Sequence, residues 1–113
     1  NPVFPLKSIL PRIRWAGLEP EQFSYISCYE NNHYCKPQIE FYEEVLKNIG
    51  KRPEQCIMVG NDVQEDLGAG QLGMDTYLIE DYMIHRTDEE IKATYRGSYQ
   101  DFFDFVMKLD PVT

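Results

Sequence analysis

The sequence predicts an α/β fold in which a parallel, Rossmann-like sheet carries helices on both of its faces. Two observations lead to this prediction. Segments with helical and strand-like patterns alternate along the 113 residues, which is typical of parallel sheets built from strand–helix–strand units. The segments 56–59 and 76–79 are short, unbroken apolar runs, as expected of strands that are covered on both faces.

The clearest expected helix covers residues 37–49. Its apolar residues recur at helical spacing, Pro37 suits the first turn, and Gly50 can end the helix. Further helices are expected at residues 5–16, 66–72 and 99–109.

A third strand is expected at residues 23–28, where apolar and polar residues alternate. The polar segment 80–98 is expected to be a loop. Tyr99, Phe102 and Phe103 come next at helical spacing and are expected in the core.

Composition excludes several classes of protein. The apolar fraction of 42% and the charged fraction of 27% are those of a globular domain. A net charge of −8 argues against nucleic acid or an anionic membrane surface as a partner. No apolar run approaches the roughly 20 residues that span a bilayer, and residues 1–5 lack the pattern of a signal peptide. Three cysteines without paired spacing favour a reducing, cytoplasmic location.

An acidic loop, residues 60–66, comes directly after the apolar strand at 56–59 and reads Gly-Asn-Asp-Val-Gln-Glu-Asp. Carboxylates this close repel one another unless a cation joins them, and Mg²⁺ is the cation that such oxygen ligands suit best. Glu65 and Asp66 also suit the N-terminus of a following helix, which is the preferred interpretation for Glu65. For Asp62, which lies inside the loop, a role in binding the cation is the preferred interpretation.

The segment 68–73 satisfies the GxGxxG pattern of dinucleotide-binding loops. That pattern must follow its strand directly, whereas here the acidic loop intervenes. We therefore expect its small residues to let a helix lie close to the sheet, with Gly73 as the helix cap.

Lys36 stands directly before Pro37, at the expected start of the long helix. A lysine at a helix N-terminus suits an anion such as phosphate. Ligands bind beyond the carboxyl ends of parallel strands, and both Lys36 and Asp62 map to that edge. His33 and Cys35 show no metal or nucleophile pattern, so both are expected to serve local structure.

Several motifs together resemble the carboxyl-terminal half of a haloacid-dehalogenase-like (HAD) hydrolase. They are Lys36-Pro37 before a helix, the strand and acids of Cys56–Asp66, and the helix end Leu72–Thr76. The segment Tyr29–Pro37 is similar to the phosphatase-like branch of the family. The stretch Asn1–Pro5 is similar to the segment directly after the family's second motif, which is a Thr or Ser at a strand end.

The resemblance implies a magnesium-dependent phosphatase that acts on a small phosphorylated metabolite. In this family an Asp attacks phosphorus and forms an aspartyl-phosphate. Lys36 would then screen charge between nucleophile and phosphate, and Asn1 would contact phosphate. Asp62 and Asp66 would hold Mg²⁺, with Asn61 as a further candidate because the register of this motif is ambiguous.

The resemblance also implies that part of the protein is missing. No Asp-x-Asp pair follows a buried strand anywhere in the chain, so the nucleophile and general acid are absent. We expect residues 1–113 to be the carboxyl-terminal part of one HAD-like core domain, without the cap domain and first strands, and inactive alone. A longer protein or a second chain would complete the sheet.

Two alternatives remain from other classes. The first is a non-catalytic module that binds magnesium or phosphate or regulates a partner. The second is a phospho-acceptor receiver domain, which is disfavoured because its acids precede its lysine, whereas here Lys36 precedes Asp62.

Overall fold

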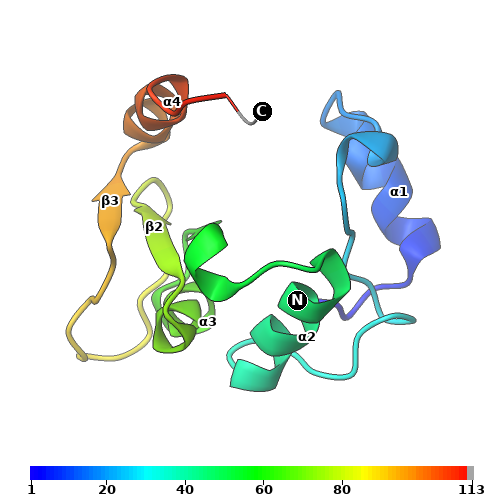
Figure 1. Ribbon diagram of the computed structural model, residues 1–113, viewed down its shortest axis with the longest axis horizontal. Helices are drawn as coiled ribbons and strands as arrows, with labels where there is room; N and C mark the ends of the chain where they lie inside the picture. Colours follow the sequence, from blue (N-terminus) through cyan, green and yellow to red (C-terminus); the bar gives the residue numbers. More distant parts are fainter. Residues whose placement is uncertain (112–113) are drawn as a thin grey trace. The chain divides into compact units, whose positions relative to one another are not determined.

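A computed structural model describes residues 1–111, which divide into two compact units. The first unit, residues 1–52, contains α1 (Leu6–Trp15), the short 3-10 helix η1 (Pro20–Gln22) and α2 (Ile39–Ile49) (Figure 1). The second unit, from Pro53 onward, contains η2 (Pro53–Gln55), β1 (Ile57–Gly60), α3 (Val63–Asp66), η3 (Leu67–Leu72), β2 (Asp75–Ile79), β3 (Tyr95–Gly97) and α4 (Tyr99–Met107). No described helix is long and apolar enough to cross a membrane.

The two helices expected in the first unit are present. The chain leaves α1 through Gly17, whose φ of 84° suits glycine. The helix α2 ends at Gly50, also in the left-handed conformation. However, α2 begins at Ile39 and not at Pro37, because a turn closed by the hydrogen bond from Gln38 N to Cys35 O (2.9 Å) precedes it.

The strand expected at residues 23–28 is not formed, so this prediction was wrong. A strand requires a neighbour with which to share a hydrogen-bond ladder, and the segment has none among residues 1–111. The N–H of Cys28 instead donates to the side chains of Asn31 (2.9 Å) and Asn32 (3.1 Å). The apolar alternation therefore reflects partial burial without sheet pairing.

The second unit contains the predicted parallel sheet, in the order β1-β2-β3. Residues Ile57 to Gly60 pair with Asp75 to Leu78, and Tyr77 to Ile79 pair with Tyr95 to Gly97. The strand β3 lies in the segment expected to be loop. Three residues, two of them exposed, give no readable alternation, so β3 depends on the tertiary pairing with β2.

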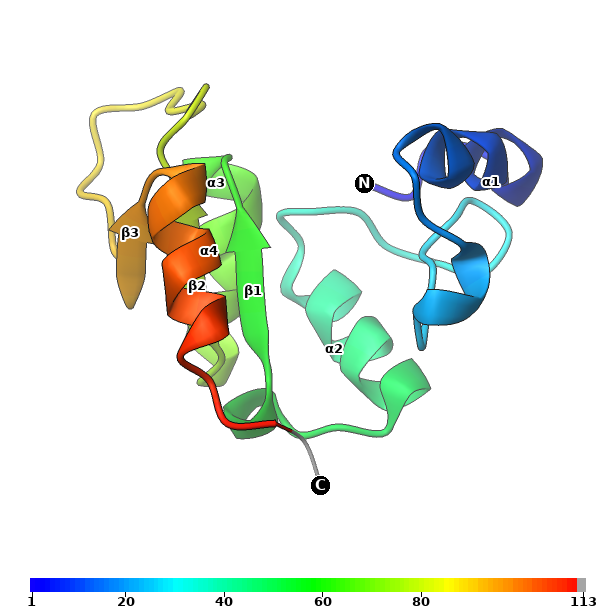
Figure 2. The same ribbon diagram turned by 90° about the horizontal axis from the view of Figure 1, so that it is seen from above.

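Helices cover both faces of this sheet, as predicted (Figure 2). Thr76 lies on the face towards η3, where its Cγ2 is within contact distance of a Cβ built on Gly70. Tyr77 points to the opposite face, with its ring 5.0 Å from that of Phe102 and 5.2 Å from that of Phe105 in α4. The buried pattern of β2 confirms the expected two-sided cover.

Three further expectations need correction. The helix expected at residues 66–72 begins at Val63 and continues as the 3-10 helix η3, since Asp62 caps it earlier than the pattern suggested. The strand β1 is only half-buried, because β2 flanks it on one side and no described strand flanks the other. The side chains of Tyr99 and Phe103 are each 58% exposed, so only Phe102 of that expected aromatic group packs against the sheet.

Candidate functional site

The acidic loop begins at the carboxyl end of β1, where Gly60 lies directly under the carboxylate of Asp66. A Cβ on Gly60 would lie 2.9 Å from Asp66 Cβ and closer still to its Cγ and Oδ2. The same Oδ2 accepts a hydrogen bond from Asp62 N (3.0 Å). Asp66 is only 5% exposed, so its carboxylate is fixed across the end of the strand.

Asp62 is the N-cap of α3, and its position follows from this role. Its Oδ1 accepts a hydrogen bond from Glu65 N (3.0 Å), which satisfies a backbone donor that the first turn leaves unpaired. Arg86 approaches from the loop after β2, with Nη1 2.7 Å from both Oδ1 and Oδ2. The Asp62 carboxylate therefore already has a positive partner.

Burial of Asp62 disfavours its charged form, but the hydrogen bond from Glu65 N and the Arg86 guanidinium outweigh burial and lower the pKa of this carboxyl. The same contact raises the pKa of Arg86. Asp62 is thus a buried carboxylate, held ionised.

Asn61 is oriented by the loop after β2. Its Nδ2 donates to Tyr82 O (3.0 Å), and its own carbonyl accepts from Ile84 N (2.8 Å). This arrangement uses the amide nitrogen and leaves Oδ1 without a hydrogen-bond donor among residues 1–111. The side-chain oxygen of Asn61 is therefore a candidate neutral oxygen ligand at the carboxyl end of β1.

Sequence reasoning missed the contribution of residues 81–89. Gln64 Oε1 accepts from Arg86 N (2.9 Å), and Gln64 Nε2 donates to Glu89 Oε1 (2.8 Å). A parallel bridge also joins Asp62 to Ile84. No local sequence pattern predicts these contacts. Arg86 is 24 residues from Asp62 and lies in a polar segment that has no hydrophobic periodicity.

The loop brings several carboxylate and amide oxygens to the end of β1. The residues expected to hold metal all lie between the end of β1 and the end of α3; they are Asn61, Asp62 and Asp66. Among residues 1–111 no group of three or more His, Cys, Asp or Glu side chains is arranged to hold a metal ion. Mg²⁺ commonly takes only one or two carboxylates and completes its shell with waters and phosphate, so this donor set is compatible with it.

The other predicted residues, Asn1 and Lys36, come together in the first unit although they are 35 positions apart. Lys36 N donates to Asn1 Oδ1 (2.6 Å), and Asn1 Nδ2 donates weakly to Lys36 O (3.5 Å). Lys36 does not stand at the helix start as expected, because α2 begins at Ile39. Lys36 and Asp62 belong to different units, so their meeting at one site stays a prediction.

Two groups expected to serve local structure make local contacts. The imidazole Nδ1 of His33 is 2.6 Å from Glu44 Oε2. The contacts of Glu44 with His33 and Asn32 are called the Glu44 clasp below. The glycine-rich segment lies in η3 (Leu67–Leu72), with Ala69 fully buried, and Gly73 caps the helix in the left-handed conformation. These small residues allow η3 to approach β2, as expected.

The profile of the HAD-hydrolase-like family matches residues 33–100, which include the acidic loop and β1. This chain belongs to the HAD-like hydrolase family. Glyceraldehyde 3-phosphate phosphatase from Methanothermobacter thermautotrophicus is 36% identical over 58 residues, which are 50% of this chain and 26% of that protein. Haloacid dehalogenase-like hydrolase domain-containing protein 2 of Homo sapiens is 36% identical over 56 residues, 49% of this chain and 22% of that protein.

Solved structures show the same fold for this HAD-like chain. A HAD phosphatase from Thermococcus onnurineus aligns with a TM-score of 0.73 and 19% identity, over 94% of this chain and 48% of that one. A β-phosphoglucomutase from Clostridium difficile aligns with a TM-score of 0.59 and 12% identity, over 94% and 55%. The matched part of this chain spans about a quarter of the length of its curated relatives.

Proposed function

We propose that this HAD-like chain is the carboxyl-terminal part of a magnesium-dependent phosphatase that acts on a small phosphorylated metabolite through an aspartyl-phosphate. The observation that carries the proposal is the acidic loop at the end of β1, with Asn61 and Asp66 oriented there. A relative named as a phosphatase supports a phosphate ester as the substrate class. The nucleophilic Asp is proposed to lie outside these 113 residues.

We assign the magnesium ligands within this chain to Asp66 and to the Oδ1 of Asn61. The sequence favoured Asp62, but its carboxylate already serves as the N-cap and binds Arg86. A cation on Asp62 would have to displace or share that guanidinium. When bound, Mg²⁺ would neutralise charge on the phosphate oxygens.

The proposed catalytic role of Lys36 is electrostatic. Its ammonium group would offset the repulsion between an attacking carboxylate and the phosphoryl oxygens, a contribution that is largest in the transition state. Asn1 binds both the N–H and, weakly, the carbonyl of Lys36, and thereby holds the backbone from which the lysine extends.

The open edge of β1 supports a longer protein or a second chain as part of the active form. Within residues 1–111 the sheet ends at β1 on one side, and buried backbone groups at such an edge need partners. We propose that a strand from outside these residues pairs there. Three free cysteines support a reducing, cytoplasmic setting.

A second candidate is a non-catalytic module that binds magnesium or phosphate or regulates a partner. It is favoured by the lack of a cluster of three ligating side chains within residues 1–111. Binding of Mg²⁺ without turnover in the longer protein would select this candidate.

The test uses a longer protein that contains both this chain and the proposed nucleophilic Asp, with p-nitrophenyl phosphate as substrate. Lys36→Ala should lower kcat on the order of a hundredfold, as expected for the loss of a transition-state charge. Lys47→Ala, which removes an exposed lysine from α2, is the matched control and should leave kcat unchanged. Equal rates for both variants would refute the role of Lys36. The 113-residue chain alone should show no turnover.

The ligand assignment is tested by magnesium titration of the same protein. Asn61→Ala should raise the magnesium concentration needed for half-maximal activity, because an oxygen ligand is lost. A larger shift for Asp62→Ala than for Asn61→Ala would restore Asp62 as the ligand.

A further inference from the structure

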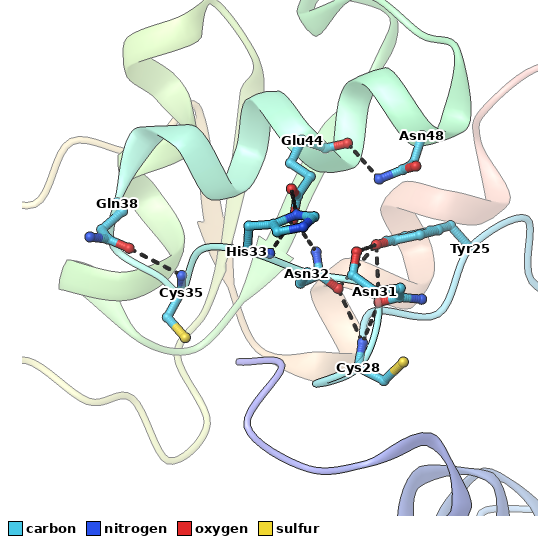
Figure 3. A network of polar contacts seen from close by, with 9 residues as sticks. All are labelled: Tyr25, Cys28, Asn31, Asn32, His33, Cys35, Gln38, Glu44 and Asn48. Carbon is cyan, nitrogen blue, oxygen red and sulfur yellow. Dashed lines mark hydrogen bonds and ion pairs between the residues drawn. The ribbon is translucent and has the colours of Figure 1, made fainter.

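The loop between Cys28 and α2 leads to Lys36, and side chains rather than a sheet hold its backbone (Figure 3). The hydroxyl of Tyr25 donates to Asn32 Oδ1 (3.0 Å), and Asn31 Nδ2 donates to Ile26 O (3.0 Å). A loop with this many side-chain partners for its own polar groups has a defined conformation.

Glu44, in the middle of α2, holds this loop onto the helix. Its Oε1 accepts from His33 N (2.8 Å) and from Asn32 Nδ2 (3.1 Å), and its Oε2 lies 2.6 Å from His33 Nδ1. Figure 3 shows the three contacts converging on one carboxylate. The Glu44 side chain is only 16% exposed, whereas that of His33 is 80% exposed, so Glu44 is the anchored member of the clasp.

The clasp lies just before Lys36 in the sequence, and a second set of contacts holds the backbone at Cys35 and Lys36. Cys35 N donates to Gln38 Oε1 (3.2 Å), and Lys36 N donates to Asn1 Oδ1 (2.6 Å). Lys36 therefore lies between the anchor at Glu44 and the anchors at Gln38 and Asn1.

We propose that Glu44 is a positioning residue for Lys36: its carboxylate clasps His33 and Asn32 so that Lys36 meets an anionic group in a fixed place. This inference rests on the proposed function, since it requires that Lys36 binds the phosphate of a substrate. The role proposed for Glu44 is indirect, because its carboxylate contacts His33 and Asn32. Its effect travels through the backbone from His33 to Lys36, three residues away.

The test compares Glu44→Gln with Glu43→Gln in the ¹⁵N-labelled longer protein that contains this chain, as used for the test of Lys36. Glu43 is the exposed neighbour on the same helix, so both variants lose one negative charge. Two quantities are measured: the exchange rate of the His33 amide proton, and the affinity for inorganic phosphate from the chemical shifts of Lys36. Glu44→Gln should speed exchange on the order of tenfold, the scale of a lost charge-assisted hydrogen bond, and weaken phosphate binding at Lys36 severalfold. Glu43→Gln should change neither.

Each outcome separates the two claims. Faster exchange with unchanged phosphate affinity would mean that Glu44 serves structure alone, and would overturn the positioning role. Unchanged exchange would overturn the clasp itself. If phosphate leaves the chemical shifts of Lys36 unchanged in the wild-type longer protein, the anion role of Lys36 in the proposed function is overturned, and the positioning role with it.

Discussion

Replacing Gly60 with alanine tests the packing at the end of β1. The φ of Gly60 is outside the left-handed range, so alanine is opposed by space alone. The new Cβ would lie 2.9 Å from Asp66 Cβ and nearer to its carboxylate. Asp66 would have to turn away and would lose its hydrogen bond from Asp62 N.

The magnitude follows from these two changes. An unsatisfied buried N–H costs about 1–3 kcal/mol, and overpacking costs about 1–3 kcal/mol. We therefore expect Gly60→Ala to lower the free energy of unfolding by about 3 kcal/mol, a large share of the roughly 5–15 kcal/mol of an ordinary domain. Urea unfolding followed by circular dichroism measures this difference.

Gly70→Ala is the matched control, because a Cβ there would meet only Thr76 Cγ2 at an ordinary distance of 3.9 Å. Its effect should stay within about 1 kcal/mol. In an Asp66→Ala background, the cost of Gly60→Ala should fall by about half, since the clashing carboxylate is gone. A loss for Gly60→Ala no larger than for Gly70→Ala would refute the reasoning.

Three further predictions concern stability. Arg86→Met should lower the urea midpoint of unfolding more than Arg96→Met does. Arg86 faces the buried Asp62 carboxylate, whereas the partner of Arg96 is exposed. Equal midpoints for the two variants would contradict this. The pKa of Glu44 is lowered by hydrogen bonds from the His33 backbone and ring, so its stabilisation is present above the usual carboxyl pKa and is lost as pH falls through the lowered value. In thermal melts from pH 6 to pH 3, the melting temperature should fall less for Glu44→Gln than for the wild type. The same fall in both proteins would argue against this contribution of Glu44. Ala69→Leu should cost about 1–3 kcal/mol by overpacking, since Ala69 is fully buried; a neutral melt would show that η3 can move.

Local pattern was enough to predict the elements whose partners are close in sequence. The apolar run of β2 required burial on both faces, and the apolar stripe of α2 with Gly50 at its end required a helix that stops there. The parallel order of the strands followed from their alternation with helices.

Long-range partners could not be predicted in this way. The alternation at residues 23–28 was the same signal as that of a strand, but no neighbour pairs with it within residues 1–111. Conversely, β3 had no signal of its own and exists because β2 offers an edge.

The fold class and the family resemblance could be predicted from the sequence, because hydrophobic periodicity and the spacing of acids involve residues that are close together in the chain. The ion pair between Asp62 and Arg86, in contrast, depends on the tertiary structure. Asp62 and Arg86 are 24 residues apart in the sequence. Whether a carboxylate faces a guanidinium, a backbone N–H or an open site depends on which distant segment folds back against it. No local pattern encodes that contact.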